Sequence, residues 1–563
     1  MYYFYIFLKT EAPDSIYKEA NEMNNAVFKM ERPTNERVLE YRTGSDELRL
    51  LQEEIARQRY TEVEIPLIIG GKEVRTGDTV PVVMPHDHGH KLGFFHKPRA
   101  EDVARAIDCA IEARACWMDL SWEERVSISL RAAELISKKY RYVLNTATML
   151  GQSKNIQQAE IDSACEVVDF LRFNAYFASE IYTEQPISSN LIMNRTEYRP
   201  LEGFIYAVTP FNFTAIASNL NMAPAVMGNV TVWKPATASI LSSYYLMKIF
   251  QEAGVPDGVI NFVPGNGSVI SGTTIPHREL AGIHFTGSNG TFNGIWRDMC
   301  AHLETYRSYP RIVGETGGKD FVFAHASADP DELATAILLG AFEYQGQKCS
   351  AASRGYIPNS LWPTVRKKLL ERLDAVRMGD PTDPKTLMGA VIDEKSFDNI
   401  ARYLDEAKRS PSVELIAGGR CDKSKGYFVE PTILLTSDPQ YPTMQVELFG
   451  PVFTVYLYDD ARYEETLALC NETSPYALTG SIFARDKYAA MIACRALRYA
   501  AGNLYLNDKP TGAMVGQQPF GGSRQSGTND KAGGMLNLLR WVSPRTIKEN
   551  LLPPTDIFYP HMR

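Results

Sequence analysis

Three side chains with the chemistry of carbonyl attack stand in separate segments of the chain. Cys349, in EYQGQKCSAAS, follows a glycine-containing turn and is flanked by small residues. A free cysteine is mostly protonated at neutral pH, so it needs a base, and Glu315 in VGETGGKD offers a carboxylate between glycines. Asn212, in TPFNFTA, carries an amide that could donate to an oxyanion. Taken singly, each is more typical of a buried cysteine or a turn residue, so the hypothesis rests on their combination.

A dinucleotide site is suggested by two glycine-containing loops that follow apolar strands. One is FVPGNG, with Gly265 and Gly267. The other is FTGSNGT, which opens a predicted helix. Its candidate residues are Gly287, Ser288, Asn289, Gly290 and Thr291. Backbone N–H groups at a helix start suit a pyrophosphate, although the glycines do not form G-x-G-x-x-G and the local signal is weak.

The elements around these residues alternate between strand and helix. Residues 230–235, 259–265 and 282–288 are predicted strands, and the segments between them have helical spacing. Repeated βαβ units predict a parallel, doubly wound sheet with ligands at the carboxyl ends of its strands. A second α/β stretch begins with FVFAH, after Gly314, and extends to about Gly522. The fold class is therefore α/β with two lobes.

The first half of the chain adds helices and hairpins. We expect helices over 45–59, 100–118 and 156–181, and one opened by the capping box of Ser121 and Glu124. PLIIGGKEV indicates two strands joined by a Gly-Gly turn. Residues 184–209 alternate in polarity and predict a β-hairpin, with which the tail, 535–563, could pair; the tail could equally pair with another subunit.

Composition excludes several classes of protein. The 563 residues suffice for about three to four domains or lobes of roughly 150 residues each. The net charge of −8 offers no basic face, so we expect no nucleic-acid partner. The eight cysteines form no CxxC pair, which argues against a metal site and for reduced thiols. No run approaches the roughly 20 apolar residues of a membrane span.

Seven short motifs occur in one order along the chain. They are PFNF, WKP, FTGS, GETGGK, GQKCSA, ELFGP and PFGG. Together they resemble the aldehyde dehydrogenase superfamily over nearly the whole chain, from about residue 40 onward. Within the superfamily the pattern is most similar to the delta-1-pyrroline-5-carboxylate dehydrogenases, on the basis of RPLEGFIYAVTPFNFTAIASNL, EYQGQKCSA and VGQQPFGGSRQSGTNDKAGG.

The resemblance implies a bilobal subunit with a discontinuous dinucleotide domain and a bridging β-hairpin that supports oligomers. The expected divisions are an N-terminal arm (1–65), dinucleotide-binding parts (66–183 and 206–314), an oligomerisation hairpin (184–205), a catalytic domain (315–534) and an oligomerisation tail (535–563). It further implies a homodimer or a higher homo-oligomer. Because the dehydrogenase pattern occupies nearly all of the chain, we expect proline dehydrogenase to be a separate protein.

The implied reaction is the NAD-dependent oxidation of L-glutamate 5-semialdehyde, formed by ring opening of pyrroline-5-carboxylate, to L-glutamate in proline degradation. Cys349 attacks the aldehyde carbon, and the Asn212 amide and the Cys349 backbone N–H hold the oxyanion. After hydride transfer to NAD, Glu315 activates the water that hydrolyses the thioester. The alternatives are another semialdehyde or aliphatic aldehyde as substrate, and a catalytically silent homologue.

The resemblance also assigns binding residues. Thr209 and Lys234 line the NAD site, and Glu447 in ELFGP binds the nicotinamide ribose. No nearby arginine is available for the 2′-phosphate of NADP, which favours NAD. Phe213 and Phe520 would sandwich the aliphatic part of the substrate.

Three further positions are expected near the substrate carboxylate. Ser350 would contact it, and so would the loop KPTGAMVGQQ, where the family typically has Gly then Ser. This chain has Gly512 then Ala513, so a hydroxyl donor is missing, and we expect the substrate carboxylate to be bound more weakly.

Eukaryotic members of the family are usually found in the mitochondrial matrix. The first residues here, MYYFYIFLKTEAPD, contain acidic side chains and no arginine, unlike standard presequences. A true start at Met23 or Met30 would give the same pattern. Localisation in the matrix, or otherwise in the cytoplasm, is therefore an expectation from the resemblance.

Overall fold

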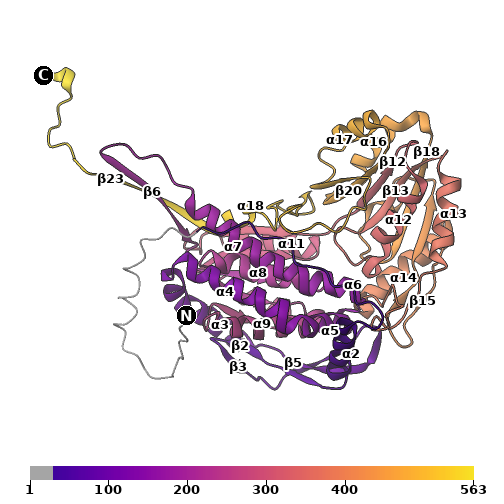
Figure 1. Cartoon of the computed structure of the whole chain (residues 1–563), viewed down its shortest axis with the longest axis horizontal. Coiled ribbons are helices and arrows are strands. Elements are labelled where there is room, and N and C mark those ends of the chain that lie inside the picture. The colour runs from indigo at the N-terminus through magenta and orange to yellow at the C-terminus, as the bar shows by residue number, and fades with distance from the viewer. Residues whose placement is uncertain (1–28) are drawn as a thin grey trace.

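Two α/β lobes, each built on a seven-stranded sheet, form the molecule, and a two-stranded ribbon projects from the first lobe (Figure 1). The computed structural model describes residues 29–563. The predictions on targeting, and the first part of the predicted N-terminal arm, concern residues 1–28 and lie outside the described residues. The two lobes confirm the α/β fold class and its two parallel-sheet lobes.

The sheet of the first lobe contains the predicted βαβ strands. In spatial order its strands are β11 (Arg311–Glu315), β10 (Leu280–Thr286), β7 (Phe204–Val208), β8 (Val230–Lys234), β9 (Ile260–Phe262), β2 (Leu67–Ile69) and β3 (Lys72–Val74). The first five run parallel to one another. At the other edge β2 and β3 form the predicted antiparallel hairpin, whose turn residues Gly70 and Gly71 have φ values of 55° and 73°.

The sheet of the second lobe is also mainly parallel. Its strands, in spatial order, are β14 (Val413–Ala417), β17 (Thr432–Thr436), β18 (Val452–Tyr458), β13 (Ala352–Pro358), β12 (Asp320–Ala324), β20 (Thr479–Phe483) and β21 (Asn503–Leu506). Only β14 is antiparallel to its neighbour. The chain crosses between the lobes from β11 to β12 through residues 316–319, which places the end of the first sheet next to the start of the second.

Alternate residues of the central strand β12 face different cores, which shows that helices cover both faces of the sheet. Val322 and Ala324 belong to the core formed with α12 and α13, whereas Phe321 and Phe323 belong to the core formed with α16 and α17. Side chains of a strand alternate between its faces. The helices of this lobe are α12 (Pro330–Phe342), α13 (Trp362–Leu373), α14 (Glu394–Arg409), α15 (Pro442–Gln445), α16 (Tyr463–Glu472) and α17 (Lys487–Ala496), with 3₁₀ turns at Glu343–Gly346 and Asp460–Arg462.

The predicted helices of the first lobe are present, as α2 (Asp46–Arg59), α3 (Ala100–Asp119), α4 (Trp122–Leu135), α6 (Ile156–Ala159), α7 (Val167–Thr183), α9 (Ile240–Ala253), α10 (Gly267–Thr274) and α11 (Asn289–Ala301). The sequence patterns do not predict two further helices, α5 (Arg141–Gln152) and α8 (Thr214–Val226). The capping box is confirmed: Ser121 Oγ accepts from the Glu124 N–H, and the Glu124 carboxylate accepts from the Ser121 N–H. π-helical turns at Ile136–Tyr140 and Glu160–Glu166 join α4 to α5 and α6 to α7. The predicted helix over 156–181 is thus continuous but locally widened.

The remaining elements are short. They are the 3₁₀ turns Thr237–Ser239 and Pro560–Met562, the sheet of β1 (Val63–Ile65), β5 (Asp87–His96) and β4 (Thr79–Met84), the pairs β15 (Cys421–Asp422) with β16 (Phe428–Val429) and β19 (Tyr476–Ala477) with β22 (Ser523–Arg524), and helix α18 (Met535–Leu539). Within residues 29–563 no helix is long and apolar enough to cross a membrane.

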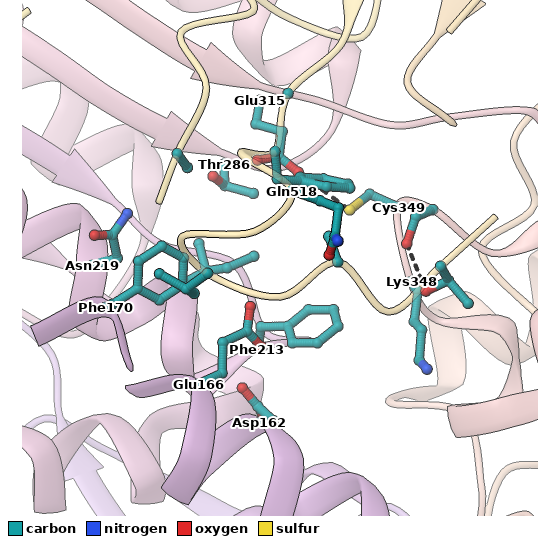
Figure 2. A pocket seen from close by; sticks show the side chains of 18 of the residues that line it. Asp162, Glu166, Phe170, Phe213, Asn219, Thr286, Glu315, Lys348, Cys349 and Gln518 are labelled. Carbon is teal, nitrogen blue, oxygen red and sulfur yellow. Dashed lines mark hydrogen bonds between the residues drawn. The ribbon is translucent and has the colours of Figure 1, made fainter. Parts of the chain in front are cut away.

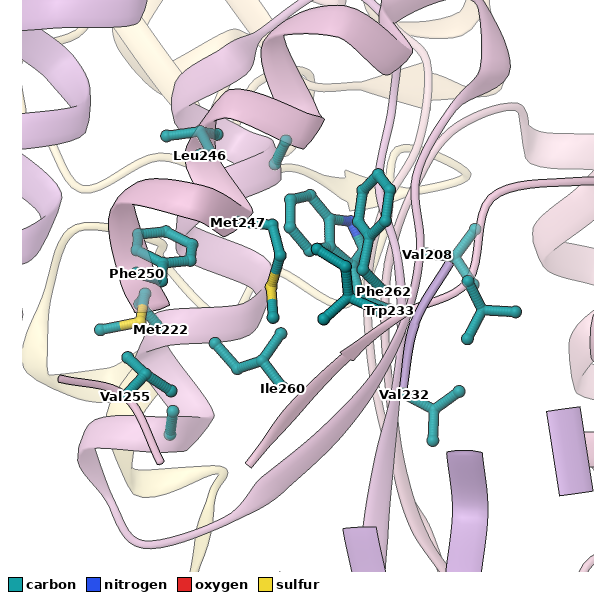
Figure 3. Close-up of a cluster of buried hydrophobic side chains, with 14 of the residues drawn as sticks. Val208, Met222, Val232, Trp233, Leu246, Met247, Phe250, Val255, Ile260 and Phe262 are labelled. Atoms are coloured by element: carbon teal, nitrogen blue, oxygen red, sulfur yellow. The ribbon is translucent and has the colours of Figure 1, made fainter. Parts of the chain in front are cut away.

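The largest core lies against the first sheet and fixes the ends of its strands (Figure 3). Trp233 of β8 is fully buried and packs edge-on against Phe262 of β9, with ring centroids 5.1 Å apart. Met247 and Phe250 of α9 belong to the same cluster. Burying one such side chain contributes roughly 1.5–3 kcal/mol, so this cluster holds the loops at the carboxyl ends of β7 and β8 in place.

The predicted hairpin at 184–205 is wrong in its pairing. The segment contains one regular strand, β6 (Ile192–Pro200), and its partner is β23 (Val542–Asn550) in the tail, in an antiparallel ladder of nine residue pairs. The chain does reverse at 189–192, but on that side the side chains of Gln185 and Ser188 bond the backbone of β6 in place of a ladder. Pro186 lacks the N–H that a ladder needs. The projecting arm in Figure 1 is therefore a ribbon of β6 and β23, one of the two pairings expected for the tail.

Candidate active site

A cavity of about 430 Å³ lies where the first sheet, the second lobe and helix α7 meet. Figure 2 shows Glu315 and Cys349 at one part of its wall and Glu166, Phe170 and Phe213 at another. Of the residues predicted from the sequence, it is lined by Phe213, Glu315, Cys349, Ser350, Gly512, Ala513 and Phe520. The structure thus brings together a nucleophile, a carboxylate and the predicted substrate residues from segments far apart in the chain.

Cys349 follows a backbone turn that few sequences could adopt. Tyr344, Gln345 and Gly346 have φ values of 51°, 55° and 66°, which is the left-handed region. A Cβ at Gly346 would lie 2.5 Å from the carbonyl oxygen of Gly450, so only glycine fits there. The turn is held because Tyr344 and Gln345 are buried. This strained turn is placed directly before the thiol, as is common where backbone strain fixes a reactive group.

The Cys349 thiol donates a hydrogen bond to Glu315, with 3.3 Å between Sγ and Oε1. Burial and the adjacent Glu315 charge raise the pKa of Cys349 well above its usual range. Burial likewise raises the pKa of Glu315 to about 7, although the thiol hydrogen bond and the Lys531 charge oppose the change. The resting pair is therefore a neutral thiol beside a carboxyl group that exchanges a proton near neutral pH, which suits a general base.

Two N–H donors stand near the thiol. The Asn212 amide donates one hydrogen bond to the carbonyl of Gln347, 3.1 Å away, two residues before Cys349. An amide nitrogen carries two hydrogens, so the second remains free of that bond. The backbone N–H of Cys349 has no hydrogen-bond partner among residues 29–563. Asn212 is not among the residues that line the cavity.

The two predicted aromatic residues are each fixed by their surroundings. The ring of Phe213 lies 4.1 Å from the ammonium of Lys154, which is fully buried and paired with Asp162 at 2.7 Å. Asp162 also accepts from the N–H groups that begin α8, so Phe213 sits at a rigid helix start. Phe520 exchanges two backbone hydrogen bonds with Ala532. Both rings line the same cavity.

The loop over residues 509–518, here called the anchor loop, forms the exposed side of the cavity. Ser350 Oγ donates to Thr511 Oγ1 at 2.8 Å, which ties the loop to the residue after the nucleophile. Gly512 has a φ of 95°, and in the described part of the chain the N–H groups of Gly512 and Ala513 have no hydrogen-bond partner. These two groups are free to bind an anion.

A surplus of positive charge adjoins the anchor loop. Lys348 and Lys509 both pair with Glu343, at 3.0 and 3.1 Å, and all three line the cavity. Although burial opposes it, the charges of the two lysines hold the pKa of Glu343 below its usual value. Two cations against one carboxylate leave this end of the cavity positive.

The predicted cofactor residues lie outside this cavity, at the carboxyl ends of neighbouring strands. Thr209 directly follows β7, Lys234 ends β8, and residues 287–291 follow β10. Ser288 caps α11, its Oγ accepting from the N–H of Thr291. Thr209 Oγ1 accepts from the Trp233 indole at 3.0 Å, so its hydroxyl also braces the core. This edge of a parallel sheet is where dinucleotides bind in doubly wound folds.

Glu447 reaches the loop between the two lobes. Its Oε1 accepts from the Gly318 N–H at 2.9 Å, and a Cβ at Gly317 would lie 2.0 Å from its Oε2. Burial raises the pKa of Glu447 to about 7. The carboxyl group therefore approaches the backbone directly after Glu315, and its Oε2 has no hydrogen-bond partner within residues 29–563.

The family model "Aldehyde dehydrogenase family" matches residues 73–547. The chain belongs to the aldehyde dehydrogenase family. A delta-1-pyrroline-5-carboxylate dehydrogenase named as mitochondrial, from Dictyostelium discoideum, is 52% identical over 533 residues, covering 94% of this chain and 96% of that protein. The Homo sapiens enzyme of the same name is 47% identical, covering 94% of each chain. A solved Mycobacterium tuberculosis delta-pyrroline-5-carboxylate dehydrogenase bound with NAD has a TM-score of 0.93 and 47% identity, covering 96% of this chain and 100% of that one.

The family implies NAD as cofactor, and the residues at the strand ends fit it. Burial alone lowers the pKa of Lys234, whose ammonium has no carboxylate partner among residues 29–563. A lysine withdrawn from water without a counter-ion fits the hydroxyl and phosphate oxygens of a dinucleotide. A Cβ at Gly290, in the first turn of α11, would meet open space, so the helix start is accessible. Lys234 and this turn would hold the dinucleotide, and the free oxygen of Glu447 suits a ribose hydroxyl.

Sequence reasoning missed Glu166 and Lys348. Glu166 lines the cavity and its carboxyl group makes no hydrogen bond within residues 29–563. Burial, reinforced by the charge of Asp162, raises the pKa of Glu166 to about 8. The sequence around Glu166, CEVVDF, contains no motif that indicates a function. The place of Glu166 in the cavity wall, at the end of the π-helical turn, becomes apparent only in the structure. Lys348 lies within the GQKCSA motif, but the motif alone does not indicate that this lysine lines the cavity.

Proposed function

We propose that the chain catalyses the NAD-dependent oxidation of L-glutamate 5-semialdehyde, formed by ring opening of pyrroline-5-carboxylate, to L-glutamate in proline degradation. The observation that carries the proposal is the cavity itself, which holds the 3.3 Å Cys349–Glu315 pair and has charged groups of both signs on its wall. The names of the relatives support the same substrate.

The catalytic residues act in sequence on the aldehyde. Glu315 takes the thiol proton, and Cys349 attacks the aldehyde carbon to give a thiohemiacetal. The second N–H of Asn212 and the N–H of Cys349 stabilise the oxygen on which negative charge develops. Bound NAD supplies the hydride acceptor that converts the thiohemiacetal to a thioester. Glu315 first releases the thiol proton to solvent and then takes a proton from the water that attacks the thioester carbon, which frees the carboxylic acid product and the Cys349 sulfur. Its pKa of about 7 suits both proton transfers.

The charged ends of the cavity match the amino-acid end of the semialdehyde. Its α-carboxylate would accept from the free N–H groups of Gly512 and Ala513, next to the lysines at 348 and 509. Its α-ammonium would pair with Glu166, whose carboxyl group has no other partner in residues 29–563. Phe213 and Phe520 would enclose the methylene groups between. An aldehyde without charged groups gains none of the polar contacts.

The test is NADH formation with purified protein and pyrroline-5-carboxylate, run beside short aliphatic aldehydes, succinic semialdehyde and the Cys349→Ala variant. We expect a strong preference for pyrroline-5-carboxylate and no turnover in Cys349→Ala. A preference for another aldehyde would keep the mechanism but refute the substrate. Full turnover by Cys349→Ala would refute the mechanism, and no turnover of any substrate by wild type would support a catalytically silent homologue.

We further propose a setting in the mitochondrial matrix, supported by the word "mitochondrial" in the names of several relatives. A separate proline dehydrogenase would supply pyrroline-5-carboxylate. The ribbon of β6 and β23 stands out from the lobe, the outer edge of β23 has no strand partner among residues 29–563, and the ribbon would pair with another subunit in a homo-oligomer. Cell fractionation and light scattering of the purified chain test these statements.

A further inference from the structure

The segment preceding α2 lies across the helices next to the cavity. We call residues 32–41 the strap. Glu36 fixes its middle, because its carboxylate accepts from Ser137, Arg141 and Arg172 at 2.9, 2.8 and 2.6 Å. The strap is thus held to helices α5 and α7 and to the π-helical turn between α4 and α5 by a nearly buried carboxylate.

A second attachment secures the end of the strap. Leu39 N–H and the Tyr41 hydroxyl both donate to the buried carboxylate of Glu160, at 2.9 and 2.7 Å. Glu160 belongs to the π-helical turn that also carries Glu166. Val38, between these attachments, lines the cavity. The strap is therefore a rigid part of the cavity wall.

The strap also reaches the anchor loop, through Asn35. The Asn35 amide donates to Asp169 of α7 at 2.8 Å and to the carbonyl of Val515 at 2.9 Å. Its oxygen accepts from the Gln517 side chain at 2.7 Å. Arg32 adds a bond to the carbonyl of Gly516 at 3.0 Å. Three hydrogen bonds of the Asn35 side chain thus connect α7 to the anchor loop, and Arg32 adds a fourth bond from the strap to the loop.

The anchor loop depends on such outside contacts. Gly512 and Gly516 both have positive φ, so the loop forms no regular element. Its tip, Gly512 and Ala513, is free of hydrogen bonds within the described residues, as a carboxylate site requires. Beyond the tip, Val515 is buried and the Gly516 N–H donates to Gly533. The tip is therefore positioned from both sides: Ser350 holds Thr511 before it, and beyond it Asn35 makes the polar link to α7.

We propose that Asn35 is a positioning residue that fixes the anchor loop for the substrate carboxylate, so that a segment some 480 positions away in the sequence sets the preference for carboxylate-bearing aldehydes. Asn35 itself touches neither the substrate nor the reacting atoms. The proposal rests on the proposed function, because it concerns the same carboxylate site.

The first experiment compares Asn35→Ala with wild type in full-length protein. The KM for the semialdehyde should rise roughly tenfold, as expected for the loss of hydrogen bonds that position one charged contact, while kcat stays within about twofold. The KM values for propanal and for NAD should not change, because neither molecule uses the anchor loop. L-Glutamate, which bears the same carboxylate, should bind roughly tenfold more weakly by calorimetry.

A paired exchange separates the link to the loop from the link to the helix. In Asn35→Asp/Asp169→Asn the amide and the carboxylate change places, so the bond between strap and α7 is retained. Aspartate cannot donate to the Val515 carbonyl, so the KM for the semialdehyde should stay raised. Asn399→Ala, an exposed asparagine on α14, is the matched control and should resemble wild type.

Each outcome decides the proposal. The proposal would be overturned if Asn35→Ala left the KM for the semialdehyde unchanged, or raised the KM for propanal equally. It would also be overturned if the paired exchange restored the wild-type KM, because a merely structural link to α7 would then suffice. Failure of the proposed function is distinguishable, because wild type would then neither oxidise the semialdehyde nor bind L-glutamate. If wild type then oxidises propanal, a lower rate of propanal oxidation in Asn35→Ala would also contradict the positioning role.

Discussion

The two sides of the cavity are built in different ways. The side with Cys349 and Glu315 is formed by a buried, strained turn and the end of a sheet strand, and its geometry follows from packing. The opposite side, at Gly512 and Ala513, is an irregular loop at the surface, held by a few hydrogen bonds. Changes on the first side should therefore abolish chemistry, whereas changes on the second should alter which aldehyde is preferred.

The largest effect on catalysis is expected from replacing the nucleophile, Cys349. Cys349→Ser keeps the size of the side chain but replaces the thiol with a far weaker nucleophile, so kcat should fall on the order of 10⁴-fold or more for every aldehyde. Steady-state NADH formation measures it. Cys116→Ser, at an exposed position, is the control. A kcat above a tenth of the wild-type value would contradict the statement that changes on this side of the cavity abolish the chemistry.

The next largest effect concerns the base. Glu315→Gln should lower kcat roughly 10²–10³-fold, within the range for a lost general base. Because the base acts when deprotonated and the pKa of Glu315 is about 7, kcat/KM in wild type should rise with pH through about 7. A pH profile of each protein checks this. The same inflection persisting in Glu315→Gln would assign it to another group.

A smaller and selective effect is expected at the ammonium site. The ammonium group of a bound substrate favours the ionised form of Glu166, and Glu166→Gln removes this ionisable group but keeps the shape of the side chain. The KM for the semialdehyde should therefore rise roughly ten- to hundredfold. The KM for propanal should be unaffected. Equal losses for both aldehydes would show that Glu166 supports the fold of the cavity and does not select the substrate.

The smallest effect should come from restoring a donor to the anchor loop. Ala513→Ser adds the hydroxyl that the family resemblance leads us to expect at this position, and the KM for the semialdehyde should fall by roughly tenfold, near the lower limit for a hydrogen bond to a charged acceptor. Kinetics with succinic semialdehyde, which lacks the ammonium group, sharpen the result. An unchanged KM would show that the two backbone N–H groups already saturate the carboxylate.

Most of the architecture could be predicted from local patterns. The βαβ repeats, the capping box at Ser121 and the Gly-Gly turn before β3 are encoded by neighbouring residues, so periodicity and turn chemistry reveal them. Sequence patterns do not decide the pairing of β6 with β23, because strand partners distant in sequence leave no local trace. The nucleophile and its carboxylate were found because their short motifs resemble a family.

The rest of the site depends on distant contacts. Glu166 enters the cavity through a widened helical turn, and Asn35 acts through a loop at the other end of the chain. Neither residue stands in a distinctive motif. Charge balance could have signalled Lys348, which directly precedes the nucleophile, but its partner Glu343 and its neighbour Lys509 become apparent only when the loop is folded.

The ribbon of β6 and β23 has a consequence for biosynthesis. Arg195 and Glu549, which form an ion pair across it, are separated by 354 residues. While the ribosome is still translating the second lobe, β6 has already emerged, and the edge that later pairs with β23 has no strand partner. Its partner β23 follows the whole second lobe in the sequence, so the arm, and any subunit contact made through both strands, can form only after that lobe has been translated.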